Sequence, residues 1–309
     1  MLYTRRELGK LALAAVPGAT LLPRLEWQAA QKDPARPDSN VAGVQIGLNV
    51  PYSFNNNLMS ADDTLEGCVK LGISAVELRS QPVELYAGAP QAAFERGATA
   101  DAKEALRKWR LSAPMDKVRE CRKKYDDAGV KIEIVKFDNI YKEPDDVTDY
   151  FFELGRTLGA RALSCEISLE ETKRLGQFAD KHQMMVGYHG HTETTPEMWE
   201  TAFGYATHNG ANVDIGHFIA GNNTSPVPFI RQHHDRITHL HIKDKKLKNG
   251  PNVPFGEGDT PIKEVLQLLR DNKWPIQATI EFEYPVPPGS SRMVEIAKCV
   301  QYCRAALSS

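Results

Sequence analysis

The stretch NVDIGHFIAG, residues 212–221, places the carboxylate of Asp214 and the imidazole of His217 where a short apolar run ends in glycines. Neighbouring apolar runs end in the same kinds of side chain: Glu166, His189, His191, His239, His241, Glu281 and Glu283. All nine histidines lie after residue 181, and five of them occupy these ends. Carboxylates and imidazoles that converge on one point form a site for Mn²⁺, Co²⁺, Zn²⁺ or Mg²⁺.

Each of these side chains, taken alone, has a simpler interpretation as a buried residue with its own hydrogen bond. Several carboxylates buried together without a cation would repel one another and lose their hydration. A metal removes that cost, so the pattern as a whole favours a site for one divalent ion.

The elements that must position these side chains alternate along the chain from Val44 onward. Eight apolar runs read as strands: 44–50, 74–80, 130–137, 161–167, 184–190, 211–216, 237–244 and 277–284. Amphipathic segments with a helical period separate them. This pattern predicts a single-domain (β/α)8 TIM barrel, whose active site forms at the C-terminal ends of the strands. A doubly wound open sheet is the alternative, although no glycine-rich dinucleotide fingerprint follows the first run.

One connection is longer than a barrel requires. Residues 86–115 separate the second strand from its helix, and we expect a helical insertion that covers the barrel mouth or makes a subunit contact. Trp109 within this insertion is the candidate for covering a sugar ring. Trp199 and Trp274 are expected to serve in packing instead.

The N-terminal segment is distinct from the predicted barrel. Residues 1–30 carry the twin arginines Arg5 and Arg6, followed by an apolar stretch too short to span a bilayer, and we interpret them as a twin-arginine signal region. Residues 31–43 are polar and are predicted to be a linker, which leaves 44–309 for the barrel. The expected location is the periplasm, either free with no membrane insertion after signal removal or anchored through an uncleaved signal.

Composition limits the partners. The net charge is −2, and removing residues 1–30 takes away four basic and two acidic side chains, which leaves about −4. This balance gives no reason to expect nucleic acid as a partner. Five scattered cysteines do not form a disulfide framework. A homo-oligomer is possible, but the sequence shows no interface.

The strand-end motifs carry a resemblance. YHGH on the fifth run, DIGH on the sixth, HIKD on the seventh, then VPFGEGD and IEFE, together with AVEL around Glu77, resemble the xylose isomerase-like superfamily of sugar (phosphate) isomerases and epimerases. Within it, the branch with ketose 3-epimerases and inosose isomerases and dehydratases is the most similar. The similarity spans essentially residues 44–305.

The resemblance implies a set of roles for these residues. One divalent ion, with Mn²⁺ expected first, is implied to be held by Glu166, Asp214, His241 and Glu281. The side chains implied or selected for the substrate are His191, His217, Lys243, His189 and Glu77. Period-two alternation leaves His239 equivalent to His241 and Glu283 equivalent to Glu281, so these choices come from the family pattern. The family usually has asparagine where Gly190 stands, and this departure is expected to open space beside the metal.

The expected chemistry is proton removal next to a carbonyl. A divalent ion stabilises the resulting enediolate, while Glu166 and Glu281 are the candidate catalytic carboxylates that take and return the proton. Lys243 either neutralises oxyanion charge or pairs with Asp244. A free ketose or keto-sugar fits export better than a sugar phosphate, and no phosphate cradle is apparent.

Alternative functions remain. A 3-keto-glycoside lyase or hydratase would use the same metal and base but expel the carbon-1 substituent. An endonuclease-IV-like phosphodiesterase should carry more histidine ligands and a basic surface, and a non-catalytic sugar-binding protein should lack a metal ligand. The sequence therefore predicts first a metal-dependent sugar isomerase or epimerase.

Overall fold

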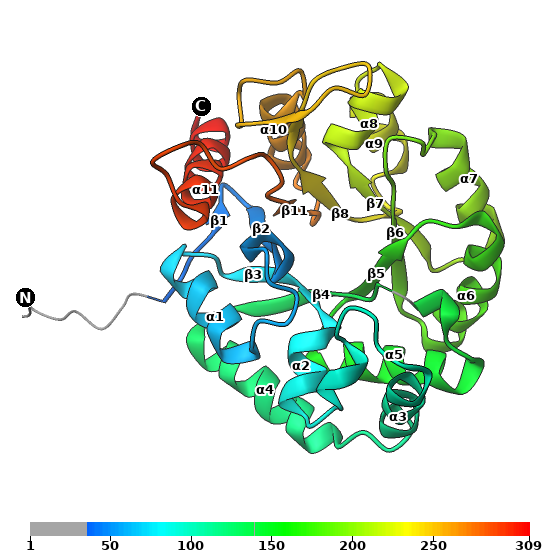
Figure 1. Cartoon of the computed structure of the whole chain (residues 1–309). Helices are drawn as coiled ribbons and strands as arrows, with labels where there is room; N and C mark the ends of the chain where they lie inside the picture. The colour runs from blue at the N-terminus through cyan, green and yellow to red at the C-terminus, as the bar shows by residue number, and fades with distance from the viewer. Residues whose placement is uncertain (1–35, 139) are drawn as a thin grey trace, which may run out of the picture. The chain divides into compact units, whose positions relative to one another are not determined.

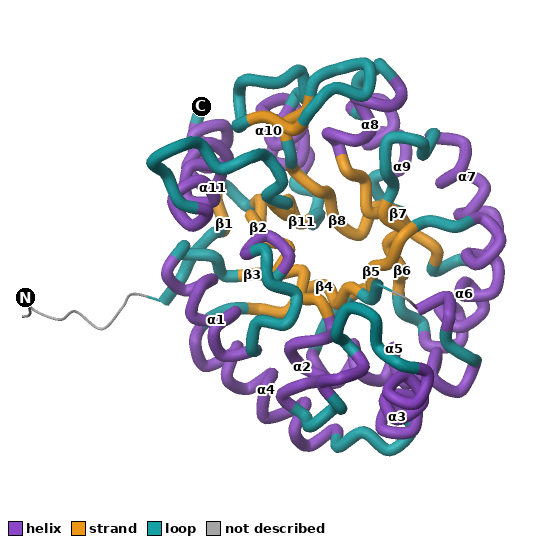
Figure 2. Tube along the Cα trace, in the orientation of Figure 1, coloured by secondary structure: helices purple, strands orange, loops and turns teal. Residues whose placement is uncertain are grey.

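Eight parallel strands close into a barrel in the computed structural model, which describes residues 36–138 and 140–309. The strand order is β2, β11, β8, β7, β6, β5, β4, β3, and β3 pairs with β2 to close the ring. The strands form an inner ring with helices outside (Figure 1 and Figure 2). They are β2 (Val44–Val50), β3 (Ala75–Arg79), β4 (Lys131–Lys136), β5 (Ala162–Glu166), β6 (Met185–His189), β7 (Asn209–Asp214), β8 (Ile237–Ile242) and β11 (Gln277–Ile280). The predicted (β/α)8 barrel is confirmed.

The strands coincide with the apolar runs because parallel barrel strands are buried on both faces, so their sequences are nearly continuously apolar. The one notable difference is at the last strand, where the predicted run reaches residue 284. There β11 ends at Ile280, and Glu281 and Glu283 follow it in irregular backbone. Both carboxylates therefore lie just beyond the strand, at the C-terminal rim of the barrel.

Helices surround the strands and supply the outer half of the core. They are α1 (Ala61–Lys70), α2 (Ser80–Tyr86), α3 (Ala100–Arg110), α4 (Met115–Ala128), α5 (Asp145–Leu158), α6 (Leu169–His182), α7 (Pro196–Tyr205), α8 (Ile215–Asn222), α9 (Val227–His233), α10 (Ile262–Asn272) and α11 (Arg292–Ser308), with 3-10 turns η1 (Tyr52–Phe54), η2 (Gln91–Ala93) and η3 (Ile140–Lys142). Within the described ranges, none of the helices combines the length and the apolar character needed to cross a membrane.

Most of the N-terminal segment lies outside the residues that the structure describes. The predicted signal region 1–30 and residues 31–35 of the predicted linker lie outside the described residues. The rest of the linker is already part of the fold: Ser39 is buried, and β1 (Asn40–Val41) pairs antiparallel with β2. Contacts with the barrel therefore begin before residue 44.

Asp244 organises the loop after β8. It lies in β9 (Asp244–Lys245), which pairs with β10 (Asn252–Val253), and its carboxylate accepts hydrogen bonds from the backbone N–H groups of Gly256, Gly258 and Thr260. The VPFGEGD motif is thus a loop folded around one carboxylate.

The long connection after β3 is helical, as the sequence predicts. It contains α2, η2 and α3, and it is anchored by Arg110, whose Nε donates to Glu84 at 2.8 Å and whose guanidinium also contacts Glu143 at 2.6 Å. Arg110 and Glu84 are both buried. A buried ion pair thus joins α3 to α2.

Candidate metal centre

Four buried side chains from four strand ends meet at the C-terminal rim of the barrel. His189 ends β6, Asp214 ends β7, His241 lies near the end of β8, and Glu281 follows β11. One potential ligand atom from each lies within 4.8 Å of the corresponding atoms of the others. We refer to these four residues as the central cluster.

In each carboxylate of the central cluster, one of the two oxygens accepts a hydrogen bond from outside the cluster. Asp214 caps the N-terminus of α8, since its Oδ1 accepts the backbone N–H of His217 at 2.7 Å. The three-residue spacing in DIGH is therefore the geometry of a helix cap. Glu281 Oε1 accepts from the amide of Asn49 at 2.8 Å. In both residues, the second oxygen remains for the cluster.

The imidazoles are held in the same manner. His241 Nε2 lies 2.6 Å from Glu77 Oε2, and His189 Nδ1 lies 2.7 Å from Glu166 Oε2. Because an ionised carboxylate only accepts, each of these nitrogens carries a proton, and the other ring nitrogen is the one directed at the cluster. A carboxylate behind a histidine ligand is a usual arrangement in metal sites.

The remaining atom of each residue faces the centre of the cluster, and the two carboxylate oxygens among them also contact the ammonium of Lys243. These atoms are His189 Nε2, Asp214 Oδ2, His241 Nδ1 and Glu281 Oε2. Three measured separations among them are 3.2, 3.6 and 3.8 Å. Tetrahedral ligands around one ion would lie about 3.4 Å apart. Two oxygens and two imidazole nitrogens suit Mn²⁺, Co²⁺ or Zn²⁺, so the residues present fit a divalent metal.

Lys243 supplies a positive charge beside the cluster. Its ammonium lies 2.5 Å from Glu281 Oε2, 2.5 Å from Glu283 Oε2 and 3.0 Å from Asp214 Oδ2. Burial alone would lower the pKa of Lys243, but these carboxylates raise it well above its ordinary value. Lys243 is therefore charged, and its partners are Asp214, Glu281 and Glu283 and not the adjacent Asp244.

Glu166 belongs to a second group, with His189 and His191, and not to the central cluster. Its Oε1 pairs with the buried Lys136 at 2.8 Å, and its Oε2 lies 2.9 Å from His191 Nε2. Burial would raise the pKa of Glu166, but His189, then His191 and Lys136, hold it far below its usual range. The side chain is 38% exposed, so an ionised carboxylate borders the cluster on its open side.

The expectation that Glu77 touches substrate is corrected. Its side chain is fully buried, and its two oxygens contact His239 Nε2 at 3.1 Å and His241 Nε2 at 2.6 Å. It therefore lies behind the cluster. The contacts of Glu77 also distinguish His239 from His241, which the strand period alone leaves equivalent. His239 bonds only within the barrel interior, whereas Nδ1 of His241 is directed at the cluster.

His217 and His191 lie beside one another near the cluster, with ring centroids 5.0 Å apart. His191 is 46% exposed, and Glu166 raises its pKa. Burial lowers the pKa of His217 to about 4, so this ring is neutral; its Nε2 lies 3.2 Å from Lys243 Nζ and its Nδ1 has no partner.

Burial and charge also act on His241. Burial would lower its pKa, but Glu281 and then Glu77 raise it to about 10. A metal that binds Nδ1 must therefore displace a proton, which is the usual coupling between metal binding and pH.

Two expectations about the surroundings of the cluster, at Gly190 and at Trp109, are wrong. Gly190 does not open space beside the cluster, because a Cβ there would lie 2.3 Å from the ring of Trp199, which fills the position and donates to Tyr188 O. Trp109 does not cover the cluster either. Its ring packs edge-to-face against Tyr150 of α5, with centroids 6.2 Å apart.

Sequence reasoning missed three supporting residues: Lys136, Asn49 and Tyr52. Lys136 and Asn49 stand near the ends of strand runs that are otherwise apolar, and that position was a usable signal. Tyr52 follows the first strand in η1, and its hydroxyl donates to Glu283 at 2.6 Å. No feature of the local sequence indicates that Tyr52 contributes to the site.

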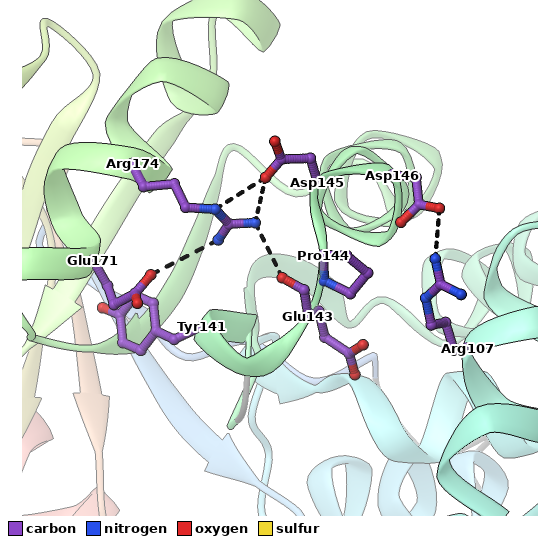
Figure 3. Close-up of a pocket in the computed structure, with 8 residues that line it drawn as sticks. All are labelled: Arg107, Tyr141, Glu143, Pro144, Asp145, Asp146, Glu171 and Arg174. Atoms are coloured by element: carbon purple, nitrogen blue, oxygen red, sulfur yellow. Dashed lines mark hydrogen bonds and ion pairs between the residues drawn. The ribbon is translucent and has the colours of Figure 1, made fainter. Parts of the chain in front are cut away.

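A separate depression of about 510 Å³ lies on the loop after β4 and on α6 (Figure 3). Its two arginines are already paired, Arg107 with Asp146 at 2.9 Å and Arg174 with Asp145 at 2.7 Å. It contains no residue of the central cluster and does not compete with it as the candidate site.

One known protein family matches part of this barrel. Residues 156–302, which carry β5 to β11, match the family model of the xylose isomerase-like TIM barrel. The matched residues form the second half of the barrel. The resemblance inferred from the strand-end motifs is confirmed. The sequence has no significant match among curated proteins.

Solved structures share the xylose isomerase-like fold at low identity. A xylose isomerase domain protein from Planctomyces limnophilus has a TM-score of 0.60 at 16% identity, covering 85% of this chain and 97% of that one. The probable 3-DHS dehydratase AsbF from Bacillus anthracis gives 0.60 at 14%, covering 84% and 99%. A D-psicose 3-epimerase gives 0.53 at 14%, covering 86% and 97%. At these identities the likeness shows the fold alone.

Proposed function

We propose that the protein is a divalent-metal-dependent enzyme that removes a proton next to the carbonyl of a keto-sugar, as a sugar isomerase or epimerase does. The observation that carries the proposal is the central cluster: four buried side chains, each fixed by one atom and each directing another potential ligand atom at the same point. The structural neighbours include an epimerase and a probable dehydratase, which is consistent with this class of chemistry.

Each part of the site has a role in this proposal. A divalent ion, when bound by His189, Asp214, His241 and Glu281, supplies Lewis-acid stabilisation of the enediolate oxygens. Glu166 takes the proton, because it is ionised, partly exposed and oriented by Lys136. Lys243 places its ammonium where negative charge develops on the substrate.

The position of Glu281 bears on the outcome of the reaction. β5 and β11 lie four strands apart in the ring of eight, so Glu281 is across the barrel from Glu166. However, both oxygens of Glu281 are engaged, one by Asn49 and the other by Lys243 and the cluster. Epimerisation needs a second proton-transferring group on the opposite face, whereas isomerisation and elimination need only one base.

This arrangement supports elimination as a second candidate. In a 3-keto-glycoside, Glu166 would take the proton from carbon 2, the C–H electron pair would form the bond between carbons 1 and 2, and the bond from carbon 1 to the glycosidic oxygen would break. The released oxygen takes a proton to become the alcohol product. The metal site and the base are those of the isomerase.

Proton NMR in D₂O tests the proposal. The protein is loaded with diamagnetic Mg²⁺ or Zn²⁺ and given free ketoses and 3-keto-glucosides. We expect metal-dependent deuterium incorporation, with release of the aglycone if elimination follows, and loss of both in Glu166→Gln. Absence of exchange with every substrate would exclude the enolising function.

We further propose that residues 1–30 direct export by the twin-arginine route and that the enzyme acts in the periplasm. Folded export would allow metal to be loaded before translocation. A non-phosphorylated sugar is then the expected substrate class.

A further inference from the structure

Lys245, in the loop after β8, is a buried lysine without a carboxylate partner. The lysines that are buried within the part of the chain that the structure describes are Lys136, Lys243 and Lys245. Lys136 pairs with Glu166, and Lys243 pairs with three carboxylates. Lys245 is only 7% exposed, yet its ammonium forms no ion pair or hydrogen bond with any described residue. Burying an ammonium without a counter-charge is unfavourable, so this position invites a ligand.

The backbone directs the Lys245 side chain toward the central cluster. Side chains alternate along extended backbone, so Lys245 lies on the same side as Lys243. Asp244, between them, lies on the opposite side, where its carboxylate binds the loop of residues 256–260. Across the β9–β10 ladder, Lys245 is paired with Asn252, whose amide donates to Glu283 at 3.3 Å. Paired residues of an antiparallel ladder share one face, so Lys245 lies on the face that carries the Lys243–Glu283 ion pair.

The charges that act on Lys245 agree with this placement. Burial lowers the pKa of Lys245, and the ammonium of Lys243 lowers it further, whereas Asp214 and then Glu283 raise it. All three charged groups belong to the central cluster or its immediate partners. The nitrogen of Lys245 is not fully enclosed by protein atoms, so a ligand at the rim can reach it.

The two carboxylates whose charges reach Lys245 are already engaged elsewhere. Asp214 uses one oxygen to cap α8 and directs the other at Lys243, 3.0 Å away. Glu283 accepts from the Tyr52 hydroxyl at 2.6 Å and pairs with Lys243 at 2.5 Å. Neither carboxylate therefore serves Lys245 as a counter-ion, and a negative charge brought by a ligand would have no competitor.

A carboxylate matches this position better than a phosphate. One ammonium balances one negative charge, whereas phosphate sites gather several N–H donors or a helix N-terminus. The neighbouring lysines do not add a second donor, because Lys243 is surrounded by carboxylates and Lys246 lies 3.8 Å from Asp259.

We propose that Lys245 binds a carboxylate of the substrate, so that the keto-sugar at the central cluster is an acidic sugar such as a keto-uronide. This inference rests on the proposed function and names the substrate class of the same site. Lys245 selects the substrate and takes no part in the proton transfer.

Substrates that differ in one carboxylate test this selection. Methyl 3-keto-glucuronide carries a carboxylate where methyl 3-keto-glucoside carries a hydroxymethyl group. For wild type we expect kcat/KM to favour the uronide by about tenfold or more, which is the usual effect of a hydrogen bond to a charged group. Lys245→Met should reduce this ratio to about one, and Lys245→Arg should retain most of it. Lys246→Met, at the neighbouring lysine that lies near Asp259, is the matched control and should keep the wild-type ratio.

Binding separates this inference from the proposed function. Calorimetric titration of the Zn²⁺-loaded protein with methyl glucuronide, methyl glucoside and glucose 6-phosphate does not depend on catalysis. Glucuronide binding that Lys245→Met removes supports the assignment even if no enolisation is found. Equal binding of glucuronide and glucoside would overturn it, as would glucuronide binding that survives in Lys245→Met because the carboxylate binds the metal instead. Tighter binding of the phosphate than of the glucuronide would overturn the choice of a carboxylate.

Discussion

At the scale of single residues, the site depends on which atom of each side chain is occupied. Glu77 contributes no ligand atom, yet it determines that His241 presents Nδ1 to the cluster by contacting Nε2 at 2.6 Å. Asp214 divides its two oxygens between a helix cap and the cluster. The function of a residue here follows from its partner as much as from its type.

Glu77→Gln should weaken metal binding. The amide cannot accept from both His239 and His241, so His241 loses its fixed orientation, and Mn²⁺ affinity should fall about 10–100-fold. Electron paramagnetic resonance of free Mn²⁺ measures this directly. Glu84→Gln, a change at another fully buried carboxylate, is the control and should leave affinity unchanged. Undiminished Mn²⁺ affinity in Glu77→Gln would contradict the assigned role.

Gly190→Ala should destabilise the fold. The added Cβ would lie 2.3 Å from Trp199, and such overpacking costs about 1–3 kcal/mol. Denaturant unfolding measures the change. Gly204→Ala in α7, where nothing lies within 4 Å of the added atom, should instead stabilise by up to about 1 kcal/mol. A Gly190→Ala protein as stable as wild type would show that Trp199 can move aside.

At the scale of elements, the local sequence was sufficient to predict the positions of the strands. It was insufficient to predict the contacts between the segments at the rim of the barrel. The run at 44–50 matches β2 without change, because its pattern reflects burial on both faces. By contrast, nothing local indicates that α3 turns back to pair Arg110 with Glu84, which lies 26 residues earlier. That contact decides whether the insertion is a fixed wall or a loose loop.

Arg110→Met should loosen the insertion. It leaves Glu84 buried without its cation, and breaking such a pair costs about 3–5 kcal/mol. We expect lower stability in denaturant and faster proteolysis between residues 91 and 99. The double variant Arg110→Met, Glu84→Gln should recover part of the loss, because no charge remains buried without a partner. If the single and double variants are equally unstable, packing and not charge dominates.

At the scale of the whole molecule, a metal held by the central cluster would link binding to folding, because the four residues come from four strand ends spread over residues 189–281. An ion at about 100 times its dissociation constant adds about 2.7 kcal/mol of stability. This should raise the melting temperature by about 5–10 °C in calorimetry, and a chelator should reverse the shift. Asp214→Asn keeps the capping oxygen but removes the ligand charge, so it should show little or no shift. A metal-induced shift of wild-type size in that variant would place the ion elsewhere.

Export is a property of the whole chain that the described residues do not test. Residues 1–30 fused to a folded reporter should carry it to the periplasm. Replacing Arg5 and Arg6 together by lysine should retain the reporter in the cytoplasm, because the route requires both arginines. Fractionation with reporter activity measures this outcome. Continued export of the lysine variant would exclude the twin-arginine interpretation.

The sequence by itself determined the barrel, the approximate positions of its strands and the family resemblance, because burial pattern and strand-end motifs are properties of short segments. It also identified Asp214, His241 and Glu281 as candidate ligands. Only the tertiary structure decided that His189 joins them while Glu166 stands aside with Lys136, and that Trp199 fills the space at Gly190. The physical reason is that side chains two residues apart on one strand point to the same face. The local sequence therefore cannot tell them apart. Contacts with other strands and helices, far away in sequence, are what make them different.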